Sequence, residues 1–510
     1  MLSLAESAAQ QERRSANLGR VVPLSATKHL AGMSSLTACG GVYLGLRYGL
    51  GILVSLGNMI VLTRWIGPHA YGLFVTSLGL SSFLAAVARG GIDTYIVRLE
   101  ESPGKPVYDV ANTLILCHSL LLVIGSAAAT PLLARWYGNR EFVPAYLVTL
   151  LTIPLAGLAG PPTAKLEREF NFRAVAAIEL GGQTLALAVS VVMAWQGFGV
   201  WAPVTGLLAW QAWAMIGAMT KARLAPALRF DVTQARAMLS FGAGYSASLR
   251  VWQLRTLVNP LLVGRFAGTE AVAFVALAIR IAEGLGFVRI AAGRLAIAAL
   301  SRLQHDRCKF QSALETALKI QVLTLGPLLC LFALVAPALV PRLMGIRWLP
   351  SLQVFPFVAA GVLLNSMYNL QASALFVAGQ QWVVLRAYVW HVVLLGLGTL
   401  LLLPRFGIVG YGWAELAACG GYAVLHTGLA RIVSISYRKL APAVLLFLAI
   451  LFTCCIATGR SVVWWIPVLA LAAIAVWTYT YPSKQRPSRS LPASINAMER
   501  TDSTLPSTGT

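Results

Sequence analysis

The stretch Arg64–Gly72, RWIGPHAYG, is a short break between two long apolar runs. A looser copy, Arg265–Ala271 (RFAGTEA), follows about 200 residues later. In both, an apolar run ends in Arg, an aromatic residue follows, and a glycine permits a tight turn. Gly67 aligns with Gly268. Any helical hairpin in a membrane favours glycine at its turn, but the copy also indicates two related halves, as in transporters built from repeats.

The composition excludes a soluble globular protein. The chain has 510 residues, of which 58% are hydrophobic and 11% charged, whereas soluble proteins carry about 25% charged residues. The formal charge is +22, but the basic residues are scattered in pairs between apolar runs. A basic stripe with interleaved aromatic residues, typical of nucleic-acid binding, is missing from the sequence. We therefore expect no nucleic-acid partner and read the basic residues as orienting a membrane protein.

The cysteine positions and the N-terminal residues argue against a disulfide-rich protein, a metalloprotein and a cleavable secretory signal. Almost all of the seven cysteines lie inside apolar runs, and the sequence has no CxxC motif or Cys/His cluster with zinc spacing. We expect no disulfide framework, no metal site and no cofactor. The first 35 or so residues are polar and lack the apolar core of a secretory signal. They are expected to form a cytoplasmic tail.

The apolar runs predict an all-α polytopic membrane protein of about 14 transmembrane helices, since a spanning helix needs about 20 mostly apolar residues. The predicted helices are 37–63, 72–92, 108–134, 143–164, 174–195, 200–220, 237–263, 270–297, 316–341, 351–378, 381–403, 408–430, 441–458 and 462–481. We expect a cytoplasmic tail at 1–35, an N-lobe of six helices at 36–220, a C-lobe of six at 221–435, two additional helices at 436–481, and a disordered cytoplasmic tail at 482–510.

The loop charges predict the orientation. With the N-terminus inside, 25 basic residues fall on the cytoplasmic side and 8 on the external side. Basic residues concentrate on the cytoplasmic side of membrane proteins. Both termini are therefore predicted to be cytoplasmic.

Arginines inside the predicted spans carry the functional signal, because an arginine at mid-bilayer costs about 2.5–3.5 kcal/mol on insertion scales. Within or at the ends of the spans are the arginines Arg47, Arg89, Arg250, Arg255, Arg280, Arg289 and Arg294, and the acids Asp93, Glu179, Glu283 and Glu415. These arginines belong to the first two helices of each proposed half. On helices seven and eight, Glu283 is outnumbered by Arg250, Arg255, Arg280 and Arg289, a surplus of three positive charges. Each arginine alone is explained by internal pairing, by snorkelling or by a position near a helix end.

As a set, these arginines favour a cationic cavity between the lobes for an anionic substrate, because the guanidinium fork matches phosphate oxygens. The predicted cavity residues are Arg47, Arg89, Asp93, Arg250, Gln253, Arg255, Arg280 and Glu283. No catalytic or metal-binding role is assigned. Glu179 and Gln183, one turn apart, are expected to form an interhelical hydrogen bond. Glu415, His391 and His426 are either proton carriers or packing residues.

Several stretches, taken in order, resemble a known family. Trp65–Phe74 and Gly91–Arg98 are similar to the N-terminal signature of the bacterial polysaccharide transporters. These are lipid-linked oligosaccharide flippases of the MOP superfamily, which also contains the MATE drug exporters. Further resemblances lie at Pro161–Arg173, Gly197–Ala202, Phe241–Gly268 and Gly345–Gln380, so the similarity spans about residues 35–435. Asn259 stands where relatives often have an acid, which puts ion coupling through that position in doubt.

The resemblance implies two six-helix lobes around a cavity lined by helices one, two, seven and eight. It also implies a non-enzymatic flippase of the bacterial inner membrane. Its substrate would be a polyprenyl-pyrophosphate-linked oligosaccharide repeat unit for exopolysaccharide, capsule or lipopolysaccharide O-antigen, moved by alternating access. Expected partners are the lipid-linked oligosaccharide, membrane lipids, H⁺ or Na⁺ as coupling ion, and other polysaccharide assembly proteins.

Two other functions stay open at this point. A MATE-like, cation-coupled exporter of drugs or small molecules would use the same fold, but its cavity should be acidic. A membrane glycosyltransferase or polysaccharide polymerase would need catalytic groups on sizeable external loops, and the predicted external loops are short.

Overall fold

The computed structural model describes residues 24–457, apart from 100, 226, 246, 288–299, 304, 305 and 439. Side chains are described from residue 49 to residue 453, with 242–249 also left out. Across that part of the chain the structure is helical and contains no strand. The predicted helix 462–481, the tail 482–510, most of the tail 1–35, and both Arg289 and Arg294 lie outside the described residues.

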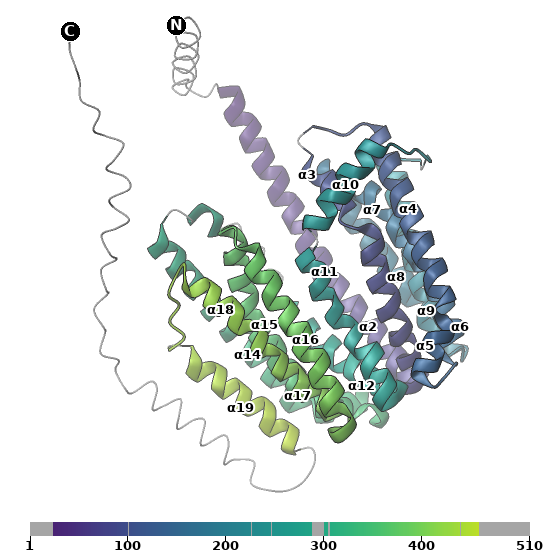
Figure 1. The fold of residues 1–510 in the computed structure, drawn as a ribbon, viewed down its shortest axis with the longest axis vertical. Helices are drawn as coiled ribbons and strands as arrows, with labels where there is room; N and C mark the ends of the chain where they lie inside the picture. Colours follow the sequence, from purple (N-terminus) through teal and green to yellow (C-terminus); the bar gives the residue numbers. More distant parts are fainter. Residues whose placement is uncertain are drawn as a thin grey trace, which may run out of the picture.

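A first group of helices precedes residue 223, at the right of Figure 1. It comprises α2 (Leu24–Arg89), α3 (Ile92–Arg98), α4 (Lys105–Ala128), α5 (Thr130–Tyr137), α6 (Phe142–Thr149), α7 (Thr152–Arg168), α8 (Phe172–Trp195) and α9 (Trp201–Ala222). The α8 helix packs on both α9 and α2, and α7 packs on α9 and α4.

A connecting segment leads from the first group to a second one. It contains α10 (Val232–Tyr245), α11 (Ala247–Leu254), the 3₁₀-helix η2 (Arg255–Leu257) and the π-helix η3 (Asn259–Val263). The second group comprises α12 (Gly264–Leu285), α14 (Arg307–Leu343), η4 (Ile346–Trp348), α15 (Ser351–Val377), α16 (Gln381–Phe406), α17 (Ile408–Ala418), η5 (Cys419–Gly421), α18 (Tyr422–Ala430) and α19 (Ala441–Ala457). Because α10 packs on α3 and α4 of the first group, the lobe boundary at residues 220–221 stays a prediction.

The predicted turn is present in both copies of the repeated stretch. Inside α2 the chain leaves helical geometry at Gly67 (φ 74°, ψ 173°), and inside α12 it does so at Gly268 (φ 85°, ψ 176°). This region of backbone space is open essentially to glycine alone. The two hairpins therefore turn with the same backbone conformation, and the glycine in each is required by that conformation.

The spans agree with the predicted membrane protein. Within the described chain, nine helical stretches are long and apolar enough to cross a membrane. Two of them, Gly49–Arg89 and Arg250–Leu285, contain the turns at Gly67 and Gly268, so each holds a pair of the predicted helices. The apolar helices α9 and α19 correspond to two further predicted spans.

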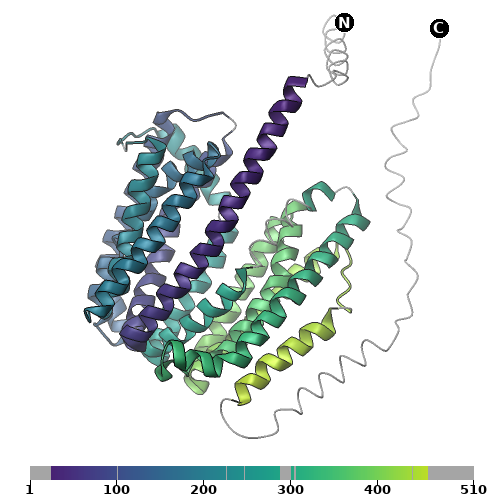
Figure 2. The ribbon, with the colours of Figure 1, turned by 180° about the vertical axis from the view of Figure 1, so that it is seen from behind.

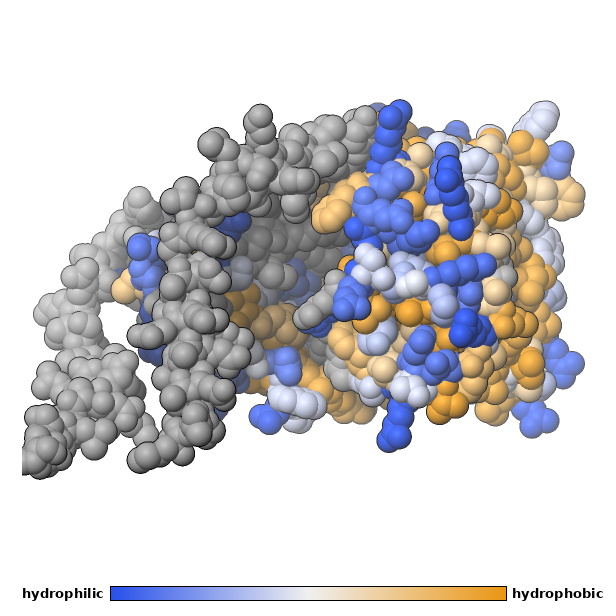
Figure 3. All heavy atoms as spheres, turned by 90° about the horizontal axis from the view of Figure 1, so that it is seen from above, coloured by the Kyte–Doolittle hydropathy of each residue, from blue (hydrophilic) through white to orange (hydrophobic). Residues whose placement is uncertain are grey.

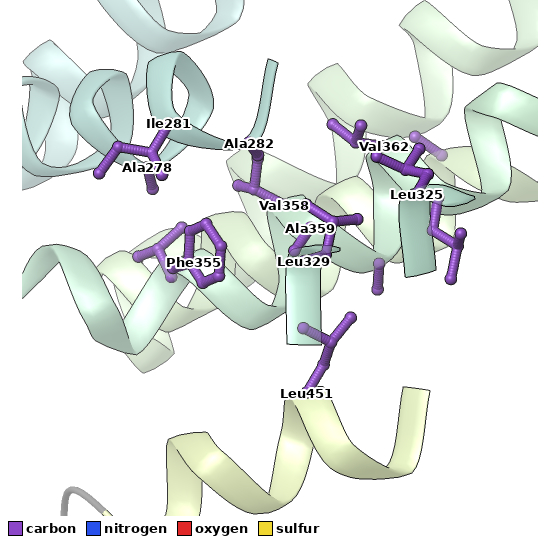
Figure 4. Packing of buried hydrophobic residues seen from close by; sticks show 14 of the residues in the cluster. Ala278, Ile281, Ala282, Leu325, Leu329, Phe355, Val358, Ala359, Val362 and Leu451 are labelled. Carbon is purple, nitrogen blue, oxygen red and sulfur yellow. The ribbon is translucent and has the colours of Figure 1, made fainter. Parts of the chain in front are cut away.

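Small side chains allow the helices of the second group to pack closely. Ala278 and Ala282 on α12 lie near Val358 and Ala359 on α15, while Leu329 on α14 and Leu451 on α19 fill the other side of α15 (Figure 4). All of these residues are buried. The α15 helix is consequently the centre of this group's core.

The two groups meet at the end of the molecule that carries both glycine turns, which we call the hairpin end. Figures 1 and 2 show α12 and the lower part of α2 side by side there, and these helices contact each other extensively. At the other end, which we call the opposite end, α2 extends beyond the remaining helices (Figure 2). The fold is thus joined at one end of the predicted spans.

Candidate functional site

A cavity of about 430 Å³ lies between the two groups and is bounded by both segments of α2 and by α8, α9 and α12. Sites of about 300–1,000 Å³ are typical for small ligands. Its polar lining residues are Ser55, Asn58, Gln183, Ser190, Arg280 and Glu283. Its larger apolar and aromatic lining residues include Met59, Leu62, Tyr71, Phe74, Leu78, Pro203, Leu207 and Trp210.

Helical spacing places the polar residues of α2 and α8 on the cavity wall. Gly51, Ser55 and Asn58 are four and three residues apart, so they share one face of the helix. Gln183 projects from α8 into the space that Gly51 leaves: a Cβ at Gly51 would lie 2.9 Å from Gln183 Oε1. Both Asn58 Oδ1 and Gln183 Oε1 are buried and have no hydrogen-bond partner among the residues that the structure describes. Two amide side chains thus line one wall, and a small rotation of either would turn its oxygen toward a donor group such as a hydroxyl.

The charged part of the wall comes from α12. Arg280 and Glu283 are three residues apart, both line the cavity, and both side chains are exposed. Neither forms an ion pair within the part of the chain that the structure describes. Buried Tyr71, whose ring lies edge-on to Trp348 at 5.5 Å, shares this wall. The described cavity can therefore offer a guanidinium to an anion and amides to hydroxyl groups.

Arg255 occupies a different environment. Its Nη2 donates to Glu415 Oε1 at 3.2 Å, and the two side chains are 13% and 5% exposed. Its guanidinium also lies 5.0 Å from the ring centre of Trp252, and the Tyr411 hydroxyl donates to Glu415 Oε2 at 3.4 Å. The acid that compensates Arg255 comes from α17, 160 residues away along the chain. Arg255 is thus a largely buried, paired cation that ties the connecting segment to the second group.

Aromatic rings surround this pair. Trp252 lies against Tyr388 and His391, with ring centres 4.8 and 5.0 Å apart, and His391 stacks on Tyr422 at 5.1 Å. His391 is buried, as is Glu415. The proton-carrying role considered for these two residues stays a prediction.

Three other predicted site residues lie at the opposite end, around the turn between α2 and α3. Arg250 Nη2 donates to the carbonyl oxygen of Gly90 at 2.8 Å. Arg89 is exposed at the end of α2, and Asp93 lies in the first turn of α3. They are separate from the cavity that Arg280 lines.

Asp93 is held in a close-fitting site. A Cβ at Gly160 on α7 would lie 2.3 Å from Asp93 Oδ1, so any larger residue there would displace the Asp93 carboxylate. Asp93 Oδ1 is buried and has no hydrogen-bond partner among the described atoms. Burial raises the pKa of Asp93 to about 6, although the positive charge of Arg89 opposes this; the negative charge of Glu167 adds to it. Asp93 therefore changes its charge near pH 6 instead of near pH 4.

The two remaining predicted site residues, Gln253 and Arg47, are not placed in the cavity wall by the described side chains. Gln253 on α11 is half-buried, and it is not in the wall of the described cavity. Arg47 lies in α2, but its side chain is outside the described part.

The cavity is sealed toward the hairpin end. Trp348 Nε1 donates to the carbonyl oxygen of Thr63 at 2.8 Å, and Gly72 packs so tightly on Thr269 that a Cβ would lie 1.9 Å from its carbonyl oxygen. His69 Nε2 lies 2.8 Å from Glu141 Oε2, and His69 Nδ1 lies 3.1 Å from the Thr269 hydroxyl. Because the carboxylate only accepts, Nε2 carries the hydrogen; in neutral His69 the Thr269 hydroxyl then donates to Nδ1, and in protonated His69 it accepts from Nδ1. The contacts of Thr269 with Gly72 and His69 join the two hairpins, and the Trp348 hydrogen bond ties η4 to α2.

Hydrophilic side chains gather over the opposite end of the first group (Figure 3). Exposed basic residues in this region are Arg98, Lys105, Lys221, Arg223, Arg229 and Arg236. Two basic residues also satisfy helix ends here: Arg168 Nη1 donates to Ile96 O at 3.0 Å, and Lys165 Nζ donates to Ala222 O at 2.8 Å. Basic side chains at helix C-termini stabilise the exposed carbonyls.

Sequence reasoning missed the amide and hydroxyl side of the cavity. The regular spacing of Gly51, Ser55 and Asn58 in an apolar run was the available signal. Glu179 and Gln183 are predicted to form an interhelical hydrogen bond, but the structure separates them: Gln183 lines the cavity, and Glu179 lies in the wall of another pocket with Lys165 and Arg168. Asn259, the noted departure from relatives, donates from Nδ2 to Val272 O at 3.2 Å and so ties η3 to α12.

Comparisons with known proteins agree with this architecture. Residues 61–353 match the family model described as polysaccharide biosynthesis protein. The succinoglycan biosynthesis transport protein ExoT of Rhizobium meliloti is 25% identical over 293 residues, which are 56% of this chain and 58% of that protein. The chain thus matches less than two thirds of that relative's length.

Two solved structures share the fold at low sequence identity. The lipid II flippase MurJ in an inward closed conformation aligns with a TM-score of 0.66 and 14% identity, over 87% of this chain and 97% of that one. A multidrug resistance MATE family transporter of the MOP superfamily, in an inward-facing conformation, aligns with a TM-score of 0.58 and 16% identity, over 75% of this chain and 95% of that one. The predicted MOP-superfamily fold is therefore confirmed.

Proposed function

Because the chain belongs to the polysaccharide biosynthesis protein family, we propose that it is a flippase for polyprenyl-pyrophosphate-linked oligosaccharide repeat units in the bacterial inner membrane. It serves the export of a surface polysaccharide, either exopolysaccharide, capsule or O-antigen. The substrate crosses the membrane without a bond being made or broken. The name of ExoT, a biosynthesis transport protein, supports this reading.

The single observation that carries the proposal is the composition of the cavity wall. Arg280 presents a guanidinium without an ion-pair partner among the described residues, beside the unpartnered amide oxygens of Asn58 and Gln183. A pyrophosphate matches the guanidinium, and sugar hydroxyls match the amides. Aromatic Trp210 and Tyr71 supply flat apolar surface in the same wall. One cavity thus offers complementary groups to both parts of the substrate headgroup, while the polyprenyl chain stays in the bilayer.

The orientation follows from charge. The segments predicted to be cytoplasmic hold 25 basic residues against 8 for the external ones, and those of the first group lie exposed at the opposite end. The hairpin end then faces outward and is sealed by the contacts of Trp348, Thr269 and His69. This arrangement corresponds to a state ready to receive substrate from the cytoplasmic leaflet, and both termini are cytoplasmic in this proposal. Export requires the two hairpins to separate while the opposite end closes.

Of the eight predicted site residues, we assign direct substrate contact to Arg280 and Glu283, and we keep Arg47 as a candidate. Arg255 holds the connecting segment through Glu415. Arg89, Asp93 and Arg250 form a second polar region at the cytoplasmic end. Asp93, with a pKa raised to about 6 by burial, is the proposed proton site if the transport is proton-coupled; Na⁺ is the other coupling ion to test.

A second candidate function is export of a cationic small molecule, as the MATE-like fold would allow. Glu283 in the cavity wall is the observation that favours it. The two functions differ in which α12 residue is indispensable: an anionic headgroup needs Arg280, whereas a cation needs Glu283.

The test is export in cells that lack the gene and carry it on a plasmid. We expect Arg280→Ala to abolish surface polysaccharide and to accumulate the lipid-linked repeat unit, whereas Arg386→Ala, which removes an exposed arginine on α16, leaves export normal. Two results together would favour the cation exporter over the flippase: normal polysaccharide export by Arg280→Ala, and drug sensitivity of cells that carry Glu283→Gln.

A further inference from the structure

A groove of about 520 Å³ lies on the outside of the molecule at the hairpin end, away from the cavity. It is bounded by α5 on one side and by η3 and the start of α12 on the other. Its lining residues are Leu132, Leu133, Arg135, Trp136, Leu261, Leu262 and Arg265. The floor is therefore leucine, and the polar groups are two arginines and one indole.

The two arginines come from different parts of the chain. Arg135 lies in the last turn of α5 in the first group, and Arg265 lies in α12 of the second group. Both are exposed. Neither has a carboxylate partner in the part of the chain that is described. Two like charges that converge on one groove favour an anion between them.

The geometry of Trp136 joins the two sides of the groove. Its Nε1 donates to the carbonyl oxygen of Leu261 at 2.9 Å, which lies in the π-helix. The Arg265 guanidinium lies 5.8 Å from the centre of the Trp136 ring. Next to it, a Cβ at Gly264 would lie 2.9 Å from the Tyr137 ring. The groove therefore exists only while α5 and η3 remain in contact.

We propose that this groove binds an anionic phospholipid of the surrounding bilayer, whose phosphate lies between Arg135 and Arg265 and whose acyl chain lies on the leucines. The argument for this occupant is charge complementarity on an apolar floor, together with a tryptophan of the kind found at membrane interfaces. Because the two arginines belong to different groups of helices, the lipid holds the hairpin end sealed. The bound lipid therefore favours the state in which the hairpin end is sealed.

The claim that the lipid keeps the hairpin end sealed rests on the proposed alternating access. The claim that the groove binds a lipid depends only on the membrane location. The two are tested separately. Lipid binding is measured on the full-length chain in nanodiscs of phosphatidylcholine with increasing phosphatidylglycerol. Closure is measured by hydrogen exchange of the backbone amides in α5 and η3.

The decisive variant is Arg135→Ala/Arg265→Ala, and its matched control is Arg140→Ala/Arg347→Ala, which removes two exposed arginines elsewhere in the predicted external loops. Native mass spectrometry should show phosphatidylglycerol bound to the wild-type chain and to the control. The decisive variant should bind it about tenfold more weakly or worse, since basic residues near an anionic surface contribute cumulatively. In nanodiscs of phosphatidylcholine alone, all three proteins should melt at the same temperature.

If the double variant fails to fold, Arg135→Gln and Arg265→Gln measured singly give the same comparison. Equal phosphatidylglycerol binding by the variants and the wild type would overturn the site. Equal stabilisation by inorganic phosphate in pure phosphatidylcholine would also overturn it, because the occupant would then be a free anion. Retained lipid binding without slower exchange in Thr130–Tyr137 and Asn259–Val263 would overturn the closure and leave the flippase function untouched.

Discussion

Arg255 and Arg280 lie in the same candidate span, Arg250–Leu285, and both would be costly in a bilayer. Yet Arg255 is buried against Glu415 and under Trp252, whereas Arg280 is exposed in the wall of a cavity and has no ion-pair partner among the described residues. One arginine is neutralised by its own acid, and the other is available to a ligand. An arginine within the membrane is therefore not a binding residue by itself; what distinguishes the two is the partner that the fold supplies.

The largest expected effect comes from breaking the buried pair. Arg255→Ala leaves Glu415 charged and buried, and removing one partner of such a pair costs about 3–5 kcal/mol. We expect a strong fall in the thermal unfolding midpoint of the purified protein in detergent. The double variant Arg255→Met/Glu415→Leu should recover most of that stability, because apolar residues of similar size replace both charges. A double variant as unstable as the single one would mean that packing, not charge, dominates at this site.

Arg280→Ala should do the reverse: it should weaken ligand binding and leave stability almost unchanged. A hydrogen bond to a charged group contributes about 1.5–3 kcal/mol, so affinity for a polyprenyl pyrophosphate should fall about 10- to 100-fold. Binding to the detergent-solubilised protein measures this. Arg280→Lys should lie between the wild type and Ala, since an ammonium keeps the charge and loses the fork. Unchanged affinity in the Ala variant would remove Arg280 from the site.

The acids also divide into a paired and an unpaired one. Glu415 Oε1 lies 3.2 Å from Arg255 Nη2, whereas Asp93 Oδ1 has no hydrogen-bond partner among the described residues. Burial raises the pKa of Asp93 to about 6 from 3.8. The contribution of Asp93 to the free energy of unfolding is thus fully favourable below about pH 4, and it is lost as the pH rises toward about 6. Asp93→Asn should therefore stabilise the protein at pH 7.5 by up to about 3 kcal/mol, since the pKa rises from 3.8 to about 6 and one pKa unit corresponds to about 1.4 kcal/mol.

The pH profile checks this prediction. Melting temperatures of the wild type should decline between about pH 4 and 6 relative to those of Asp93→Asn, and the difference should be constant above pH 7. Glu167→Gln, which removes the neighbouring negative charge, should move the wild-type transition to lower pH. Parallel profiles for the wild type and Asp93→Asn would contradict the assignment.

The smallest effect is expected at Gly51. A Cβ there would lie 2.9 Å from Gln183 Oε1, and the end of a flexible side chain can move away, so Gly51→Ala should cost less than about 1 kcal/mol of stability. Transport should nevertheless fall a fewfold, because Gln183 leaves its place in the wall beside Arg280. Gly57→Ala, where a Cβ would meet nothing within 4 Å, is the control and should transport normally.

Much of this architecture is predictable from local patterns. Apolar run length indicates the spans, and the glycine of RWIGPHAYG indicates a turn whose backbone conformation recurs at Gly268. The low charge and the scattered arginines indicate a membrane transporter. Each of these signals depends on neighbouring residues, which is why the sequence carries them.

Which arginines are paired and which line the cavity cannot be predicted from such local patterns. Glu415 lies 160 residues from Arg255, and nothing near Arg255 in the sequence indicates that this acid is its partner. Likewise Gln183 faces Gly51 only because α8 packs on α2. Which charges are neutralised is decided by tertiary packing, so the sequence indicates a set of candidates and the fold selects among them.

The measurement that tests the account most directly is flipping of a polyprenyl-pyrophosphate-linked oligosaccharide in proteoliposomes that contain only this protein. The account predicts that wild-type protein and Arg386→Ala move the lipid between leaflets, and that Arg280→Ala, with an unchanged melting temperature, does not. Flipping by Arg280→Ala at the wild-type rate would contradict the claim that this free guanidinium holds the pyrophosphate.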